Sequence, residues 1–174
     1  MKNRSAIVAS IVGVVLLALI AVFAFSGDHE SKDTNQLVGR PVPTIDTLDT
    51  EGRPFRTADY RGRFLLVNFF GTWCPPCIAE HPELVRFAET HDRLGDASVV
   101  SIAYQDTPEK VAQFFADNGG DWAVLNAEDT RLVVEFGVVA MPESYLVAPD
   151  GTVLHKFVGN LTAAQVEAEM EKYA

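Results

Sequence analysis

Hydrophobic positions divide the chain into an almost entirely apolar first segment and a remainder in which short apolar runs alternate with polar stretches. From Ala6 to Phe25, 18 of 20 residues are apolar and none is charged. About 20 helical residues span the ~30 Å hydrocarbon core of a bilayer. We therefore expect residues 1–26 to form a signal-anchor transmembrane helix. The alternative is cleavage after Ser26, since Ala24 and Ser26 fit a small-x-small cleavage site.

The charges beside this segment predict its orientation. Lys2 and Arg4 precede it, and Asp28, Glu30 and Asp33 follow it. Because basic residues favour the cytoplasmic side, we predict a single-pass protein of the cell membrane whose C-terminal domain lies outside the cytoplasm, on the periplasmic or extracytoplasmic face. A cleaved form would be exported as well.

After the apolar segment we expect a spacer and then one folded domain. Residues 27–40 are polar and lack periodicity, which is typical of a flexible linker. Residues 41–174 contain the regular patterns of a domain. Two short β-like stretches at 43–48 and 53–57 flank Gly52 and predict a leading β-hairpin.

The next elements predict a strand and helix around the only two cysteines. Residues 63–70 (RFLLVNFF) are too apolar for a half-exposed strand and too short for a helix, which indicates a strand buried on both faces. Pro75 and Pro76 fit only the first turn of a helix, expected over 75–93. Further elements are predicted as a strand at 97–104, a helix begun by Thr107 and Pro108, a strand at 122–125, a helix at 129–136, strands at 144–147 and 152–158, and a helix capped by Thr162 and Gln165 that runs to the end.

This order of elements predicts an α/β fold. Strand-helix units form parallel sheets, and the late hairpin adds antiparallel strands, so we expect a mixed β-sheet with helices on both faces. Hydrophobic residues make up 48% of the chain, which excludes disordered and fibrous classes. Past residue 26 the chain carries 12 basic and 24 acidic residues, so nucleic acid is excluded as a partner.

The cysteines lie in the motif Trp73-Cys74-Pro75-Pro76-Cys77, and a later segment reads Phe136-Gly137-Val138 and then Met141-Pro142-Glu143-Ser144. The first motif between a strand and a helix resembles thioredoxin. The whole order, from about residue 37 to the end, is more similar to the membrane-tethered TlpA, ResA and CcmG (DsbE) family of thiol-disulfide oxidoreductases. The resemblance implies a thioredoxin fold with an N-terminal β-hairpin extension and a central βα insertion at 105–125.

The position of Cys74 makes it the expected attacking sulfur. It lies at the N-cap of the predicted helix, where the helix dipole favours a thiolate. Pro75 and Pro76 have no N–H, which leaves the Cys77 N–H as the nearest donor to the sulfur. We therefore expect a moderately acidic Cys74, which is typical of a reductase more than of an oxidase.

Two other uses of the cysteine pair fit less well. A disulfide that closes four residues removes only about 2 kcal/mol of unfolded-state entropy, which makes it a poor staple. A structural zinc site needs four ligands, and the four histidines show no His-x-x-His spacing. We therefore predict a redox-active disulfide between Cys74 and Cys77, with no metal and no other cofactor.

The resemblance also implies substrate-binding residues. The family's matching proline, here Pro142, is cis and faces the disulfide, and Met141 would offer backbone groups to an extended substrate segment. Trp73 would pack beside the disulfide. The alternatives are a trans turn proline at Pro142 and an ordinary core side chain at Trp73.

Two carboxyls are candidate catalytic residues. Glu80 lies three residues after Cys77 on the same helical face and would exchange a proton with that thiol. Glu143 matches an acidic residue of the CcmG-type motif and would place a second negative charge near the thiols. Either one would otherwise be a solvated surface charge. Asn68 stands where thioredoxin has a buried Asp, and His81 is expected on the helix surface.

The function implied is reduction of disulfides in apocytochrome c Cys-x-x-Cys-His sites during cytochrome c maturation. A transmembrane thiol carrier of the DsbD or CcdA type would supply electrons, and the domain would act as a monomer. The alternatives are a general disulfide oxidase and a Cu(I)-binding module that uses both thiolates. A peroxiredoxin is disfavoured because Gly71 stands where that family has Thr.

Overall fold

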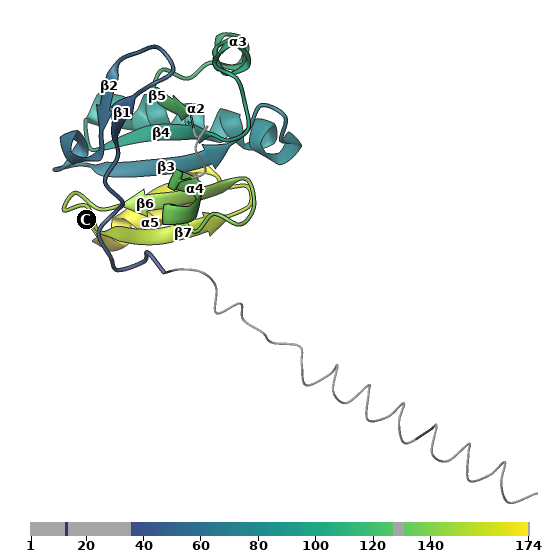
Figure 1. Cartoon of the computed structure of the whole chain (residues 1–174). Helices are drawn as coiled ribbons and strands as arrows, with labels where there is room; N and C mark the ends of the chain where they lie inside the picture. Colours follow the sequence, from purple (N-terminus) through teal and green to yellow (C-terminus); the bar gives the residue numbers. More distant parts are fainter. Residues whose placement is uncertain (1–12, 14–35, 127–130, 174) are drawn as a thin grey trace, which may run out of the picture. The chain divides into compact units, whose positions relative to one another are not determined.

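The computed structural model describes residue 13, residues 36–126 and residues 131–173 (Figure 1). The predicted signal-anchor helix, apart from residue 13, and most of the predicted spacer lie outside the described residues. Among the residues that are described, no helix is both long and apolar enough to cross a membrane.

A five-stranded mixed sheet forms the centre of the domain (Figure 1). In spatial order its strands are β5 (Ala123–Asn126), β4 (Ala97–Ala103), β3 (Phe64–Phe70), β6 (Glu143–Val147) and β7 (Val153–Val158). The first three are parallel, whereas β6 is antiparallel to β3 and β7 is antiparallel to β6. The mixed sheet predicted from the sequence is therefore confirmed.

The predicted leading hairpin is also present. It consists of β1 (Asp46–Leu48) and β2 (Pro54–Arg56), followed by a short 3-10 helix, η1 (Thr57–Tyr60), that the sequence pattern did not predict. The Thr50 N–H donates to the Val124 carbonyl at 2.8 Å and ties the hairpin to β5. Gly39 and Arg40, at the end of the predicted spacer, form backbone hydrogen bonds with Val153 of β7.

The helices, apart from the one that begins at Arg131, begin directly after the capping residues that the sequence indicates. They are α2 (Pro75–Leu94), α3 (Pro108–Asn118), α4 (Arg131–Phe136) and α5 (Ala163–Met170), with a 3-10 turn, η2 (Glu171–Tyr173), after α5. Thr107 and Thr162 accept from backbone N–H groups of the first turns of α3 and α5. The final α-helix therefore stops earlier than predicted, and the first residues predicted for α4 lie outside the described residues.

Alternation along β3 separates two layers of core. Leu65, Val67 and Phe69 face a cluster that includes the hairpin residue Phe55 and Phe136 of α4. The other side of the sheet packs on α2 and α5, and its cluster continues to a third one around the cysteines and α3. Helices therefore cover both faces of the sheet, as predicted. The insertion, α3 with β5, supplies the edge strand beside β4.

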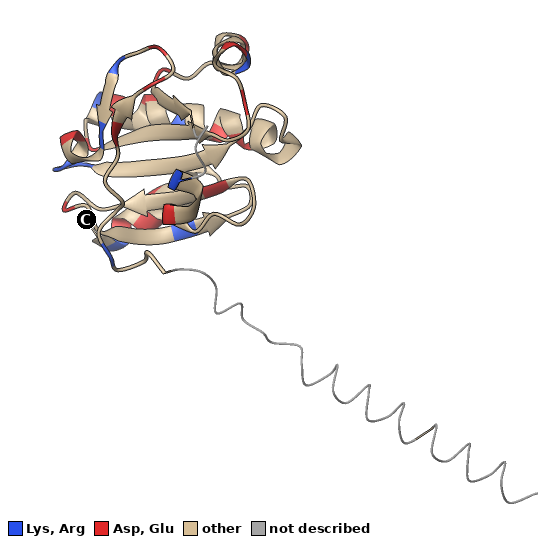
Figure 2. Cartoon of the chain, viewed as in Figure 1, with Lys and Arg blue, Asp and Glu red and all other residues tan. Residues whose placement is uncertain are grey.

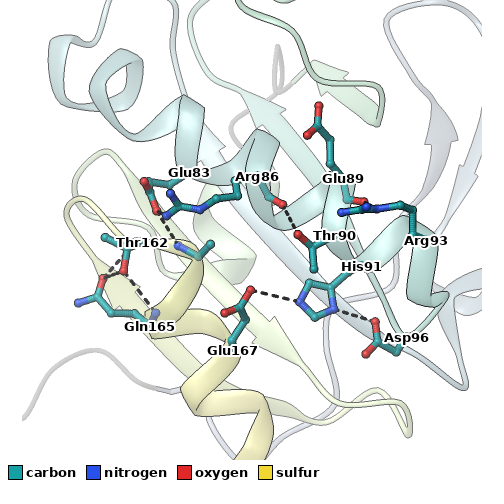
Figure 3. A network of polar contacts seen from close by, with 11 residues as sticks. Glu83, Arg86, Glu89, Thr90, His91, Arg93, Asp96, Thr162, Gln165 and Glu167 are labelled. Atoms are coloured by element: carbon teal, nitrogen blue, oxygen red, sulfur yellow. Dashed lines mark hydrogen bonds and ion pairs between the residues drawn. The ribbon is translucent and has the colours of Figure 1, made fainter.

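Polar contacts join α2 to α5 and to Asp96, which directly precedes β4 (Figure 3). Glu83 accepts from the Ala163 N–H at 3.0 Å. Near the end of α2, His91 Nδ1 donates to Asp96 Oδ1 at 2.7 Å, and His91 Nε2 lies 3.7 Å from Glu167 Oε1. Acidic residues are spread over several helices and loops of the domain (Figure 2). The excess of negative charge is therefore not confined to one element.

Candidate active site

Cys74 and Cys77 form a disulfide bond at the start of α2. Cys74 is the N-cap in an extended conformation, and its Sγ accepts from the Cys77 N–H at 3.3 Å. Pro75 and Pro76 occupy the first two helical positions and have no N–H to donate. The cap geometry predicted from the sequence is therefore confirmed. Both cysteines are buried in this oxidised state, with 4% and 3% exposed.

Trp73 lies at the surface of the loop that leads to Cys74. Its side chain is 53% exposed, and Nε1 donates to the Tyr104 carbonyl at 3.1 Å. The ring lies so close to Gly71 that a Cβ there would be 2.6 Å from Trp73 Nε1. Glycine at position 71 therefore permits this ring position, and Trp73 is not a core side chain.

The Met141-Pro142 peptide bond is cis. Pro142 is buried, and the half-buried Met141 packs against the cluster that contains both cysteines. The structure thus brings Met141 and the disulfide to the same end of the sheet. Their contact with a substrate stays a prediction.

Glu80 is buried in the interior, with 1% exposed. Its Oε1 accepts from Asn68 Nδ2 at 2.9 Å, and its Oε2 accepts from the Leu161 N–H at 2.8 Å. Burial raises the pKa of Glu80 to about 7, although the hydrogen bonds from Asn68 and Leu161 act in the opposite direction and lower it. Such a carboxyl can take up or release a proton at the pH at which thiols exchange.

Glu143 is completely buried and forms an ion pair with Lys156 of β7. The Lys156 Nζ lies 2.9 Å from Glu143 Oε2 and also donates to the Gly137 carbonyl at 3.1 Å. The Val139 N–H donates to the same carboxylate oxygen at 3.3 Å. Glu143 is therefore not a solvated surface charge, and Lys156 balances its carboxylate, whereas its predicted effect on the thiols stays a prediction. The pair instead holds the loop that precedes Met141.

His81 is a second difference from the sequence prediction. It is buried, with 3% exposed, rather than on the helix surface. Its Nε2 lies 2.8 Å from the Gly119 carbonyl, and its ring packs edge-on against Phe114 and Phe115 of α3. Burial lowers the pKa of His81, which favours the neutral ring. The cause is the insertion, which covers this side of α2.

Sequence reasoning missed several polar partners of the site, namely Lys156, Ser101, Ser144 and Trp122. One signal was available. Asn68 is the one polar residue of β3 and Ser101 is the fully buried polar residue of β4, and a buried polar residue must find a hydrogen-bond partner. Lys156 gave a weaker signal, since a basic residue in an antiparallel strand is usually exposed.

Comparisons with known proteins agree with this geometry. Residues 37–173 match the Redoxin family. The chain is 32% identical over 149 residues to the thiol:disulfide interchange protein DsbE of Pseudomonas aeruginosa, which covers 83% of this chain and 80% of that protein. It is 25% identical over 172 residues to the thiol-disulfide oxidoreductase ResA of Bacillus thuringiensis, with 99% and 98% covered.

A solved structure gives the same result for the fold. The thiol:disulfide interchange protein of the thioredoxin family from Chlorobium tepidum TLS superposes with a TM-score of 0.70 at 27% identity. The match covers 76% of this chain and 94% of that chain. The predicted thioredoxin-like fold is therefore confirmed.

Proposed function

The chain belongs to the Redoxin family and is a thiol-disulfide oxidoreductase, and on that premise we propose that it reduces protein disulfides outside the cytoplasm, specifically those of apocytochrome c Cys-x-x-Cys-His sites. Residues 1–26 would anchor it in the membrane. A transmembrane thiol carrier of the DsbD or CcdA type would return it to the dithiol form.

The reaction consists of two exchanges of sulfur bonds. The Cys74 thiolate attacks one sulfur of the substrate disulfide, and the other substrate sulfur leaves as a thiolate. Cys77 then gives its proton to the Glu80 carboxylate, and the Cys77 thiolate attacks the Cys74 sulfur. The Cys74-Cys77 disulfide forms and the second substrate sulfur leaves. Two electrons pass from the protein to the substrate.

The observation that supports the reducing direction is the N-cap of α2. Pro75 and Pro76 leave the Cys77 N–H, at 3.3 Å, as the helix donor to the Cys74 sulfur. A thiolate with few donors is less stabilised, so the dithiol is a better reductant than in a strong oxidase. The exposed Trp73 and the loop before Pro142 would receive the extended substrate segment.

The test uses the full-length protein in its reduced form and a peptide that carries an oxidised Cys-x-x-Cys-His site. We expect the peptide disulfide to be reduced while Cys74-Cys77 becomes oxidised. Cys74→Ser should abolish the reaction, and Cys77→Ser should trap a mixed disulfide on Cys74. Mass spectrometry of the alkylated products measures all three.

The equilibrium reduction potential separates this proposal from a disulfide oxidase. A reductase should have a potential well below that of a strong oxidase such as DsbA, which lies at about −120 mV. A reduction potential of about −120 mV, together with no reduction of the peptide, would contradict the proposal that the protein is a reductase. Unchanged peptide reduction by Cys74→Ser would contradict the exchange mechanism itself.

A further inference from the structure

A buried chain of hydrogen bonds crosses the sheet next to Glu80. Ser144, Asn68 and Ser101 lie side by side in register on β6, β3 and β4, and each is 1% exposed. Asn68 Nδ2 donates to Glu80 Oε1 at 2.9 Å and to Ser144 Oγ at 3.0 Å. Ser101 Oγ donates to Asn68 Oδ1 at 3.5 Å, and Trp122 Nε1 donates to Ser101 Oγ at 2.8 Å. The chain therefore connects Trp122, just before β5, with the Glu80 carboxyl.

The indole sets the direction of the first bond in this chain, and the Ser101 hydroxyl can then donate the next one. An indole N–H can only donate, so Ser101 Oγ must accept from Trp122. The Ser101 hydroxyl hydrogen then points to the Asn68 carbonyl oxygen. With its oxygen held there, the Asn68 amide turns its NH₂ group toward Glu80 and Ser144. A flipped amide would place its carbonyl oxygen against the Glu80 carboxylate, where two acceptors face each other without a donor.

We propose that Trp122 and Ser101 are positioning residues that fix the direction in which the Asn68 amide faces the Glu80 carboxyl. Their hydrogen bonds reach Glu80 only through Asn68, and Trp122 also packs against the cluster that contains both cysteines. An amide neither takes up nor releases a proton near neutral pH, so the chain orients the carboxyl without conducting its proton. The consequence for exchange rests on the proposed function, in which Glu80 receives the proton of Cys77.

The Asn68 amide is one of the main groups around Glu80 that influence the ionisation of its carboxyl. Strands β3, β4 and β5 contain no titratable side chain. Burial opposes ionisation of Glu80, and the Leu161 N–H and the Asn68 amide favour it. The buried or half-buried titratable groups of the elements around Glu80 are Cys74 at the N-cap of α2, Cys77, His81, Glu83 and His91 on α2, Glu143 and Tyr145 on β6, Lys156 and His155 on β7, and Glu167 and Glu169 on α5.

Most of these groups have other partners. Glu143 is neutralised by Lys156 at 2.9 Å. Glu83 forms an ion pair with Arg86 and accepts from the Ala163 N–H. Glu167 and Glu169 lie beside His91 and His155 rather than beside Glu80. A change in the hydrogen bond from Asn68 should therefore be visible in the titration of Glu80.

Trp122→Phe is the sharpest variant. Phe keeps an aromatic ring against His81 and Phe115, whose rings lie 5.5 and 5.3 Å from that of Trp122, and removes the N–H together with one of the two fused rings. Ser101→Ala removes the next link and is the second variant. In both, the Asn68 amide loses its fixed direction, so ionisation of Glu80 becomes less favourable. We expect the pKa of Glu80 to rise by roughly 0.5 to 1 pH unit.

The measurement is a carbon-13 NMR titration of the Glu80 carboxyl in the full-length oxidised protein, with the signal assigned by its loss in Glu80→Gln. The pH profile of peptide reduction is recorded on the same variants and should shift in the same direction. Ser98→Ala, on the same strand but at a position with the opposite orientation, is the matched control and should shift neither curve.

The outcomes separate the two proposals. If Trp122→Phe and Ser101→Ala both leave the Glu80 titration unchanged while each protein stays folded, the positioning role is overturned. If Ser101→Ala does not fold, Trp122→Phe decides alone. If the Glu80 titration moves but Glu80→Gln reduces the peptide at the normal rate, the positioning role holds and the catalytic role of Glu80 fails.

Discussion

Glu80 and His91 are buried titratable side chains near opposite ends of α2, and they differ in their partners. Glu80, in the second turn, accepts from two neutral N–H groups in the interior. His91, in the last turn, faces Asp96 and Glu167, whose side chains are 49% and 41% exposed (Figure 3). Water and salt screen the charges around His91, whereas Glu80 is buried away from water, and its burial makes ionisation unfavourable. Because burial is the main cause that raises the pKa of Glu80, whereas the partners of His91 are half-exposed, we expect exposure of the surroundings to decide how strongly each group affects stability.

Lys156 gives the largest expected effect, because both members of its ion pair are buried. The Lys156 and Glu143 side chains are 2% and 0% exposed. Lys156→Met would leave the Glu143 carboxylate unpaired in the interior and should lower the free energy of unfolding by about 3–5 kcal/mol. Urea unfolding of the oxidised protein measures this difference.

A matched control exists on the surface. Lys172 pairs with Glu169, and its side chain is 62% exposed, so Lys172→Met should cost less than about 1 kcal/mol. The double variant Lys156→Met with Glu143→Gln should recover part of the loss. Equal costs for the two lysine variants would mean that burial of the lysine does not govern these contacts.

The pH dependence of stability should reveal Glu80 next. Its pKa is about 7 in the folded protein against a reference value of 4.5. The folded state therefore holds a proton that the unfolded chain releases between these values. Preferential protonation of Glu80 in the folded state adds about 3 kcal/mol to the free energy of unfolding below about pH 4.5. This contribution is lost as the pH rises through about 7.

Glu80→Gln isolates this contribution. Gln stays neutral at every pH, so the variant should gain about 3 kcal/mol relative to the original protein between about pH 4.5 and pH 8. The other titrating groups cancel in the difference between the two proteins. If the two proteins differ by the same free energy of unfolding at both pH values, Glu80 ionises in the folded state as easily as in water.

Exchange kinetics should separate the two ends of α2 as well. Loss of a positioned acid or base typically costs about 100-fold or more in rate, so Glu80→Gln should reduce the peptide disulfide about 100-fold more slowly near pH 7. His91→Gln should stay within about twofold of the original rate, because His91 and its partners Asp96 and Glu167 lie at the end of α2 that is far from the cysteines. A comparable loss of rate in both variants would contradict the expectation that Glu80, but not His91, takes part in the exchange.

Local signals explain which parts of this structure could be predicted. The starts of the helices follow from Pro75, Thr107 and Thr162, because caps and first-turn prolines act within a few residues. The buried strands follow from uninterrupted apolar runs such as 64–70. The N-cap geometry of Cys74 needed only the residues next to it, and it was predicted correctly.

The partners of the site depend on distant segments, so the sequence pattern did not identify them. His81 is buried because α3 and Gly119 cover it, and these lie more than 25 residues away along the chain. Lys156 reaches Glu143 because β6 and β7 pair with an irregularity between Leu146 and Val147. A periodicity argument gives the face of a residue but not the register of its neighbouring strand.

The smallest effect is expected at Glu167. Its Oε1 lies 3.7 Å from His91 Nε2, which is longer than a hydrogen bond, and its side chain is 41% exposed. Glu167→Gln should therefore change the free energy of unfolding by less than about 0.5 kcal/mol, and about 1 M salt should remove even that difference. Urea unfolding at low and high salt measures it, with Glu80→Gln as the variant whose effect salt should leave in place. A loss above about 1 kcal/mol that persists in salt would mean that a half-exposed carboxylate is coupled to His91 as strongly as a buried one, and partner exposure would no longer explain how the two ends of α2 differ.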